Sequence, residues 1–386
     1  MDARRNSLLF FAAVWALALS ATFAGFPPDW KPDGTEAPAP RPPLKAASLL
    51  SGRFGEDFER WCARKFGLRG LCIRLAHQLG WELFRTLPNP GGTTIDRGKD
   101  GWLYEHEYVR HHVRRPGMRK EDAEAFAGRM AALRDRLAER GIPLVVCLSP
   151  SKAAVYPEHL PEYAQPAAAS LRNTPARDIL AERLRAAGVA VVDARALFLG
   201  WKDEGTLLFP RNGTHWNAWG AQRVFDAVLA AARAQGAALP PVPETVGHED
   251  APPLGPDRDL SNLYNMLRYP YPEKAVPYPV LAENPAPEGR RLRIFGVGDS
   301  FSFQLADAMG RTGAVASFRL LYYNKADYRF SWAPGERPRE NGSARFRLPS
   351  FDAEAFDLGE ATRDCDLVVV EMNDIYARSC AWGFGP

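Results

Sequence analysis

The chain has 386 residues, enough for one large domain or two small ones with an ample apolar core. Its apolar, charged and aromatic fractions are ordinary for a globular protein, which excludes disorder throughout the chain. The 49 basic and 46 acidic residues balance to a formal net charge of +3. Such a balance gives no support for a nucleic-acid partner.

The five cysteines form no CxxC pair and no other spacing typical of a metal site. Cys147 lies in an apolar run, so we expect it to be buried. Cys62 with Cys72, and Cys365 with Cys380, are close enough in the chain to form disulfides in an oxidising compartment. The sequence leaves both pairings open.

The N-terminal segment, residues 1–26, is predicted to be a transmembrane segment. Residues 7–26 carry no charge and follow Arg4 and Arg5, which favour a cytoplasmic N-terminus. An uncleaved signal-anchor and a signal peptide cut near Ala24 are both compatible with this pattern. The proline-rich stretch 27–45 predicts an extended spacer before a domain over 46–386.

The domain alternates predicted helices and strands, which is typical of a layered α/β sheet. Helices are predicted over 54–87 (broken near Gly67 and Gly70), 121–140, 176–187 and 218–234, with a further helix beginning at 303–309. Strands are predicted over 142–148, 189–192, 292–297, 315–323 and 367–370, with a turn entering another strand at 100–104. Residues 240–290 are predicted to be a long irregular insertion, and 325–347 a basic, aromatic loop.

A candidate nucleophile, Ser300, follows the apolar run 292–297 in the stretch Gly-Asp-Ser and precedes a predicted helix. A serine at a strand-to-helix turn exposes its hydroxyl group and has helix N–H groups nearby that can hold an oxyanion. A simple turn is the competing interpretation of the same three residues. We expect Asp299 to fix the turn through backbone hydrogen bonds.

A candidate base, His215, lies in the stretch Asn-Gly-Thr-His-Trp-Asn just before a predicted helix. Acyl transfer needs a nucleophile, a base, a group that orients the base, and donors for the oxyanion. Asn373 follows the last apolar strand, at the edge where open α/β sheets bind ligands. Its amide is a candidate oxyanion donor, although a capping role is equally open.

The order of these motifs resembles the SGNH-hydrolase-like domain of the AlgX/AlgJ-type alginate O-acetyltransferases. The histidine stretch 214–217 precedes the serine stretch 298–302, the reverse of the order in GDSL esterases. Supporting similarities lie at 65–69, 98–104, 149–157 and 259–267, so the resemblance runs from about residue 54 to about residue 374. It implies a three-layer, flavodoxin-like α/β fold with a circularly permuted motif order, preceded by one N-terminal transmembrane helix.

One position departs from the family. The family motif is Asp-Thr-His-Trp, and its Asp, which orients the His, corresponds to Gly213 here. Loss of a triad acid costs on the order of 10⁴ in rate in a serine protease. Three outcomes are possible. Another carboxylate orients His215, a Ser-His dyad works without an acid, or the protein binds polysaccharide without catalysis. The polar residues near in sequence that could orient the ring are Asp193, Asp203, Glu204 and, as a neutral partner, Asn212.

The resemblance implies an O-acetyltransferase in the periplasm, tethered to the inner membrane. Ser300 would carry the acetyl group and His215 would deprotonate a polysaccharide hydroxyl, with no cofactor. A membrane-bound O-acyltransferase partner would supply the acetyl group. An acetyl esterase, which passes the acetyl group to water instead, is the rival enzyme. The candidates for contact with the glycan are Lys152, Trp216, Tyr323, Tyr328, Trp332, Arg337 and Arg339.

Overall fold

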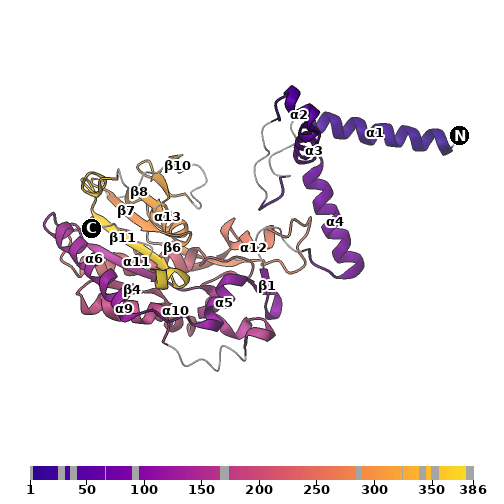
Figure 1. The fold of residues 1–386 in the computed structure, drawn as a ribbon. Helices are drawn as coiled ribbons and strands as arrows, with labels where there is room; N and C mark the ends of the chain where they lie inside the picture. The colour runs from indigo at the N-terminus through magenta and orange to yellow at the C-terminus, as the bar shows by residue number, and fades with distance from the viewer. Residues whose placement is uncertain are drawn as a thin grey trace. The chain divides into compact units, whose positions relative to one another are not determined.

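The computed structural model describes residues 3–24, 31–34, 41–65, 67–88, 95–165, 174–283, 289–323, 325–338, 345–348 and 356–379 (Figure 1). The chain divides into two compact units. One comprises Met1–Ile95 with Leu260–Pro272, and the other comprises Asp96–Asp259 with Glu273–Pro386. All residues of the candidate site lie in the second unit.

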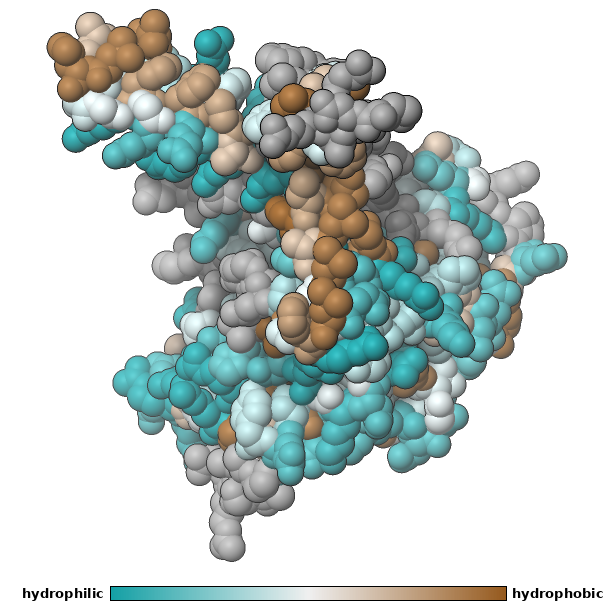
Figure 2. All heavy atoms as spheres, turned by 90° about the vertical axis from the view of Figure 1, so that its right-hand side faces the viewer, coloured by the Kyte–Doolittle hydropathy of each residue, from teal (hydrophilic) through white to brown (hydrophobic). Residues whose placement is uncertain are grey.

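The first unit contains mostly helices: α1 (Ala3–Ala24), α2 (Ala46–Leu50), α3 (Arg53–Lys65) and α4 (Arg69–Phe84). The predicted break near Gly67 is confirmed, since α3 ends at Lys65 and α4 begins at Arg69. Helix α4 exposes apolar side chains, which contribute to the brown surface in Figure 2: Leu75, Leu79, Leu83 and Phe84.

One expectation and one open possibility for this unit are not supported. Within the ranges that the structure describes, no helix is both long enough and apolar enough to cross a membrane, so the expected transmembrane segment at 1–26 lacks support. Cys62 on α3 and Cys72 on α4 are both exposed free thiols, so the first possible disulfide is absent. Cys365, in the second unit, is also a free thiol, and Cys380 lies outside the described residues.

The second unit is built on a seven-stranded sheet with the spatial order β10-β9-β8-β7-β11-β3-β4. Five strands are parallel: β3 (Leu144–Ser149), β4 (Ala190–Asp193), β7 (Leu292–Gly298), β8 (Val315–Tyr322) and β11 (Leu367–Asn373). β9 (Ala326–Ser331) and β10 (Arg345–Leu348) extend one edge in antiparallel register. Each of the five parallel strands was predicted from its apolar run.

The strand order shows the circular permutation directly. Counted from β7, the five parallel strands are β7, β8, β11, β3 and β4, and their spatial order reads 2-1-3-4-5. This is the order of flavodoxin-like sheets. The two strands that would end such a chain, β3 and β4, here begin it. The mixed α/β, SGNH-like fold expected from the motif order is therefore observed.

Helices cover both faces of the sheet and give three layers. α11 (Ala218–Arg233) and α13 (Phe301–Arg311) pack on one face, while α6 (Lys120–Ala138) and α9 (Ala176–Ala186) pack on the other. Side chains alternate between the two faces along β3. Val145 and Cys147 pack in the core on the side of α11 and α13, while Leu144, Val146 and Leu148 pack in the core on the side of α6 and α9. The helix predicted over 121–140 is observed as α6, and it buries one apolar stripe: Phe126, Met130, Leu133 and Leu137.

Two stretches predicted to be irregular contain strands. Within 240–290, β5 (Thr245–Ala251) pairs with β6 (Val276–Leu281) in an antiparallel ribbon. The chain between these two strands contains α12 (Asp259–Asn262). Pro277 and Pro279 in β6 are tolerated because a two-stranded ribbon leaves one edge of each strand unpaired. Within 325–347, β9 was missed because its charged residues hide the alternation; Asp327 pairs there with Arg319 of β8.

Several short helices were not predicted. They are α5 (His106–Arg114), α7 (Lys152–Val155) and α10 (Ala194–Lys202), which follow β2 (Leu103–Glu105), β3 and β4 respectively. β2 is the strand expected after the turn at 100–104. α7 and α10 begin at the carboxyl ends of β3 and β4, on the edge of the central sheet that carries the candidate site. β2 belongs to a separate two-stranded sheet with β1 (Ile95–Arg97), but α5 reaches the same site, because its Tyr108 packs against Phe301 with 6.4 Å between ring centroids.

Candidate active site

Ser300 lies at the point where the order of the parallel strands reverses. It follows β7, immediately precedes α13, and is next to the carboxyl end of β11. Ligands of open α/β sheets bind in the crevice at such a switch point. Gly298 allows the turn, because a Cβ there would come within 2.1 Å of Ser302 Oγ and 2.8 Å of Glu371 Oε2.

His215 reaches Ser300 from the loop before α11. Its Nε2 lies 2.8 Å from Ser300 Oγ, so the hydroxyl can donate a hydrogen bond to the ring. The ring packs edge-on against Phe301, with 4.9 Å between centroids, and its side chain is 16% exposed. Asn217 begins α11 by accepting a hydrogen bond from the Gly220 N–H, which fixes the end of the loop. The two residues predicted from the motifs are thus in contact.

The residue that orients the ring is Asp259, the first residue of α12. Its Oδ2 lies 2.8 Å from His215 Nδ1, and its Oδ1 accepts a hydrogen bond from the Thr214 N–H at 2.8 Å. Ser300, His215 and Asp259 therefore have the connectivity of a Ser-His-Asp triad. The carboxylate missing at position 213 is supplied by Asp259, which lies 44 residues after His215 in the chain.

Asp259 was not predicted from the sequence, where 259–267 was only a supporting similarity and the candidate acids were those close to His215. The one available signal was an aspartate between a proline-rich stretch and a short apolar segment, which is typical of a helix start. That signal does not identify the partner of the side chain.

Gly213 is compatible with this arrangement for a steric reason. A Cβ at residue 213 would lie 2.5 Å from the carbonyl oxygen of Pro256 and 2.9 Å from the carbonyl carbon of Asp257. Both are backbone atoms of the chain that delivers Asp259, and they cannot rotate away. The chain that brings the acid to His215 therefore occupies the space that a side chain at 213 would need.

The acids considered from the sequence have other partners. Asp193 caps α10 through the Ala196 N–H and pairs with Arg177 and Arg185. Glu204 pairs with Arg223 on α11. Asp203 ends α10, and Asn212 Oδ1 accepts from the Glu273 N–H. None of them holds the His215 ring, so these alternatives are wrong.

Asp299 and Asn373 tie the serine turn to the neighbouring strand. Asp299 accepts from the Phe301 N–H at 3.0 Å and from the Asn373 N–H at 2.9 Å, the backbone role expected for it. The Asn373 side chain is fully buried, and its Oδ1 accepts from the Ile375 N–H at 3.3 Å. In the described part of the chain, Asn373 Nδ2 has no hydrogen-bond partner. A buried amide donor is thus left unused beside the serine turn.

A buried carboxyl group beneath the turn was not predicted. Glu371 lies in the apolar strand β11 and accepts from the Asp299 N–H at 3.0 Å, from Ser302 Oγ at 2.9 Å and from Ser149 Oγ. Burial, and then the charge of Asp299, raise the pKa of Glu371 well above its usual range. Burial also raises the pKa of Asp299. Two buried carboxyl groups therefore share the space under the nucleophile, and the protonated state of Glu371 is favoured.

Glu105 is a third carboxyl group near the histidine. Burial raises the pKa of Glu105, and the charge of His215 opposes this shift. The residue ends β2 and precedes α5. It was not singled out from the sequence, because the nearby motif at 98–104 stops one residue before it.

Three of the residues expected to contact the glycan lie in the interior. Trp216 is fully buried, with its ring centroid 5.9 Å from that of Phe198 and 5.0 Å from that of Phe301. Trp332 and Lys152 are also buried. A surface role for these three side chains is therefore wrong, since the first two belong to the core and the ammonium of Lys152 is used internally.

The remaining glycan candidates have mixed positions. Tyr323 lies next to the serine turn, because its N–H donates to the Gly298 carbonyl at 3.0 Å and its hydroxyl is 3.0 Å from that of Tyr376. Tyr328 on β9 packs against Phe303. Arg337 lies near Gly313, beyond the end of α13 opposite to Ser300. Arg339 falls outside the described residues.

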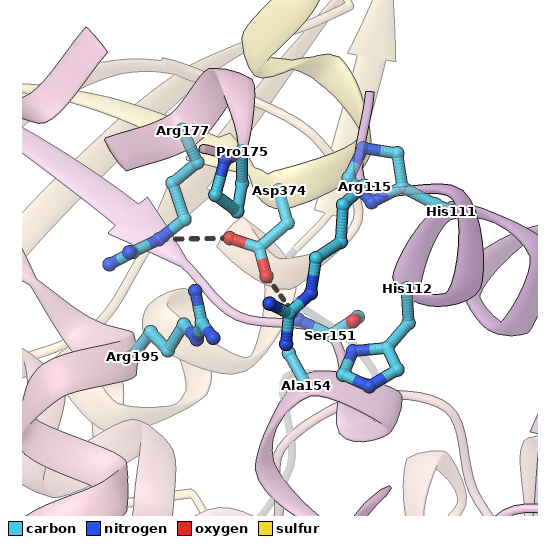
Figure 3. A pocket seen from close by; sticks show the side chains of 9 residues that line it. All are labelled: His111, His112, Arg115, Ser151, Ala154, Pro175, Arg177, Arg195 and Asp374. Atoms are coloured by element: carbon cyan, nitrogen blue, oxygen red, sulfur yellow. Dashed lines mark hydrogen bonds and ion pairs between the residues drawn. The ribbon is translucent and has the colours of Figure 1, made fainter. Parts of the chain in front are cut away.

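A second polar cluster lies on the same edge of the sheet (Figure 3). Asp374, which follows β11, pairs with Arg177 Nε at 3.0 Å and accepts from the Ser151 N–H at 3.3 Å. Burial lowers the pKa of both His111 and His112 to about 4, so both rings are neutral near pH 7. Across the described ranges, no group of His, Cys, Asp and Glu is arranged to hold a metal ion.

The chain is similar to acetyltransferase-related proteins. Residues 95–300 match the family described as SGNH hydrolase-like domain, acetyltransferase AlgX. The chain is 34% identical over 176 residues to the probable alginate O-acetylase AlgJ of Pseudomonas aeruginosa. These aligned residues are 46% of this chain and 41% of that protein. The chain is also 30% identical over 176 residues to the protein of the same name from Pseudomonas fluorescens, which covers 46% and 42%. The chain thus spans less than half the length of these relatives.

A solved structure is also similar. The O-acetyltransferase domain of Pseudomonas putida AlgJ is 20% identical to this chain, with a TM-score of 0.43. The similarity covers 74% of this chain and 92% of that domain.

Proposed function

This chain belongs to the AlgX family of SGNH hydrolase-like acetyltransferase domains, and we propose that it transfers acetyl groups to hydroxyl groups of a secreted polysaccharide through an acetyl-Ser300 intermediate. One observation carries the proposal: Ser300 Oγ, the His215 ring and the Asp259 carboxylate are joined by two contacts of 2.8 Å. This arrangement can activate a serine hydroxyl.

The first half of the reaction would form the acyl-enzyme. Ser300 Oγ attacks the carbonyl carbon of the acetyl donor while His215 Nε2 takes the hydroxyl proton. Asp259 accepts the hydrogen bond of the Nδ1–H and stabilises the imidazolium that forms. The leaving group departs with the proton from His215, and the acetyl group remains on Ser300 as an ester.

The second half would transfer the acetyl group to the sugar. A sugar hydroxyl attacks the acetyl-Ser300 carbonyl, and His215 Nε2 takes its proton. The tetrahedral species collapses to the acetylated sugar, and Ser300 Oγ recovers its proton from His215. The donors that we assign to the oxyanion are the Ser300 N–H and the buried Nδ2 of Asn373, which has no other partner in the described residues.

Asp259 also removes the main argument for an inactive, polysaccharide-binding protein. That argument rested on Gly213, where the family has its acid. Since the carboxylate reaches His215 from α12 instead, a glycine at 213 does not imply a missing triad acid.

We further propose that the reaction takes place in the periplasm, with a membrane-bound O-acyltransferase as the acetyl donor. Fractionation of cells that express the chain with a reporter fusion would test this location.

The test of the activity uses the purified chain with a chromogenic acetyl ester. We expect ester turnover in the parent and loss of turnover in Ser300→Ala and His215→Ala. Ser51→Ala, in the first unit, and His248→Ala, on β5, are matched controls on exposed residues, and they should keep the parental rate. Turnover that persists in Ser300→Ala would contradict the proposal.

The same assay separates transfer from hydrolysis. Acetylated oligosaccharide, detected by mass spectrometry when acceptor oligosaccharides are added, indicates a transferase. Release of free acetate alone, unchanged by acceptors, indicates an acetyl esterase. The acetyl-Ser300 intermediate itself should appear as an acetylated peptide containing residue 300 after rapid acid quench.

A further inference from the structure

Lys152 has a buried ammonium group that is bound by a single loop. The residue begins α7 directly after β3 and is 2% exposed. Its Nζ donates to the carbonyl oxygen of Pro210 at 3.0 Å, to that of Arg211 at 3.1 Å, and to that of Gly213. An ammonium has three N–H donors, so these three carbonyl groups use all of them. The loop they belong to leads directly into His215.

The surroundings of this ammonium are built for a cation. Nζ lies 5.7 Å from the ring centroid of Trp102 and 5.1 Å from that of Tyr104, within the range of cation–π attraction. Glu273 holds the other side of the loop, since its carboxylate accepts from the Arg211 N–H at 2.8 Å. The loop before His215 is therefore fixed both through its carbonyl groups and through an N–H group.

The peptide group between Gly213 and Thr214 links Lys152 to the triad. Its oxygen accepts from Lys152, and its N–H donates to Asp259 Oδ1 at 2.8 Å. The other oxygen of Asp259 contacts His215, which contacts Ser300. One continuous series of hydrogen bonds therefore runs from the buried ammonium through one peptide group to the nucleophile.

We propose that Lys152 is a positioning residue for this centre, whose ammonium holds the 213–214 peptide group so that Asp259 and His215 keep the geometry required by Ser300. The inference rests on the proposed reaction of Ser300. The physical reason is twofold. Without a cation, three buried carbonyl dipoles would converge with no donor, which is costly. A donor on the peptide oxygen also polarises the peptide, which strengthens the N–H bond to Asp259.

Protonation of the ammonium adds a testable property. Burial lowers the pKa of Lys152 to about 7, while Asp259 and Glu273 act in the opposite direction. Tyr104, whose ring packs against the ammonium, is also titratable, but burial raises the pKa of its hydroxyl, so it stays neutral. Loss of the proton leaves two donors for three carbonyl groups. We therefore expect the ester turnover of the parent to fall as pH rises above about 7.

The experiment compares pH profiles of kcat for the full chain and three variants. Lys152→Met keeps the length of the side chain without a charge, and Lys152→Arg keeps a charge at every accessible pH. Lys202→Met is the matched control, because Lys202 Nζ also donates to a backbone carbonyl, that of Val155 at 2.8 Å, and also lies over a tyrosine ring, that of Tyr156. Lys202 does not contact the loop before His215.

The expected result is specific. Lys152→Met should lower kcat about 10–100-fold, as expected for a small misplacement of a catalytic group, and its profile should lack the fall above about pH 7. Lys152→Arg, if less impaired, should also lack the fall. Lys202→Met should keep both the rate and the profile of the parent. A Lys152→Met protein with the parental rate and profile would overturn the proposal, as would a Lys152→Arg protein that keeps the fall.

A second readout does not depend on activity. The Nδ1–H proton of His215, hydrogen-bonded to Asp259, should give a downfield NMR resonance in Ser300→Ala. Adding Lys152→Met should weaken that resonance and speed the hydrogen exchange of the Thr214 amide. If the parent shows no ester turnover but these NMR changes occur, the proposed reaction fails and the positioning role stands. If turnover is present and the signals are unchanged by Lys152→Met, the positioning role fails alone.

Discussion

Asp259 holds His215 from a distant part of the chain, and the same carboxylate also binds the N–H of the residue before that histidine. The two contacts, each 2.8 Å long, fix the ring relative to its own backbone. The carboxylate is only partly buried, with its side chain 31% exposed. Because Asp259 binds both the ring and the backbone next to it, it can orient His215 as an acid within the histidine motif would.

Replacing Asp259 should be almost as damaging as replacing the base. Both carboxylate oxygens of Asp259 accept N–H bonds, one from Thr214 and one from His215. In Asp259→Asn one of these oxygens becomes an NH2 group, and an NH2 group facing Nδ1 favours the wrong tautomer of the ring. We expect kcat to fall by up to about 10⁴-fold, as for a triad acid in serine proteases. Ester turnover measures the effect, and Asp203→Asn, at the end of α10, is the control that should keep the parental rate. Equal rates for Asp259→Asn and the parent would remove Asp259 from the centre.

Position 213 should not accept the family acid. Gly213→Asp in the Asp259→Asn background should fail to restore turnover, because a Cβ at 213 would meet the backbone of residues 256 and 257. Gly213→Ala alone should lower the free energy of unfolding by about 1–3 kcal/mol, the usual cost of overpacking. Urea unfolding measures this cost. Gly128→Ala in α6, where a Cβ meets nothing within 4 Å, is the control and should not destabilise the chain.

The amide of Asn373 should act on the transition state. Asn373→Ala removes the buried donor that has no partner in the described residues. We expect kcat to fall about 10²–10³-fold with little change in KM, which is the effect of losing one oxyanion donor. Steady-state kinetics on the acetyl ester would show it. A rise in KM with kcat unchanged would instead indicate a role in substrate binding.

The carboxyl group of Glu371 should make stability depend on pH. Its pKa is raised in the folded chain, so its contribution to stability is fully present below the ordinary carboxyl pKa of 4.5 and is lost as pH rises towards the raised value. Glu371→Gln cannot titrate. Above pH 5, the free energy of unfolding should therefore fall more steeply with pH in the parent than in Glu371→Gln. The difference between the two slopes is at most about 1.4 kcal/mol per pH unit.

Urea unfolding of both proteins at several pH values from 5 to 8 measures this difference. Glu249→Gln, an exposed position on β5, should leave the slope of the parent unchanged. Parallel slopes for the parent and Glu371→Gln would show that Glu371 is ionised in the folded chain.

The centre of the sheet could be predicted from the sequence because β3, β7 and β11 are buried along almost their whole length and read as apolar runs. The outer parallel strands β4 and β8 are only partly buried, but they keep enough apolar residues to be predicted. β9 and β5 were missed, since charged residues interrupt the apolar pattern of each. Ser300 and His215 were found because each lies in a short stretch whose chemistry is local. Asp259 and Glu371 act through contacts across the fold, and no local pattern marks such contacts.

Residues 152 and 216 show the limit of assigning roles by residue type. A lysine and a tryptophan next to motif residues suggest a sugar-binding surface, but both side chains turn inward. The direction of the side chain depends on the packing of α7 and α11, which the sequence did not specify.

The close approach of the 256–257 backbone to Gly213 has a consequence for how members of this family are recognised. A screen that requires an aspartate two residues before the histidine would class this chain as a degenerate copy. What the chemistry requires is a carboxylate oxygen within hydrogen-bond distance of the far ring nitrogen, whichever segment carries it. In this chain that oxygen comes from Asp259, so a glycine two residues before the histidine is no sign of a lost triad acid.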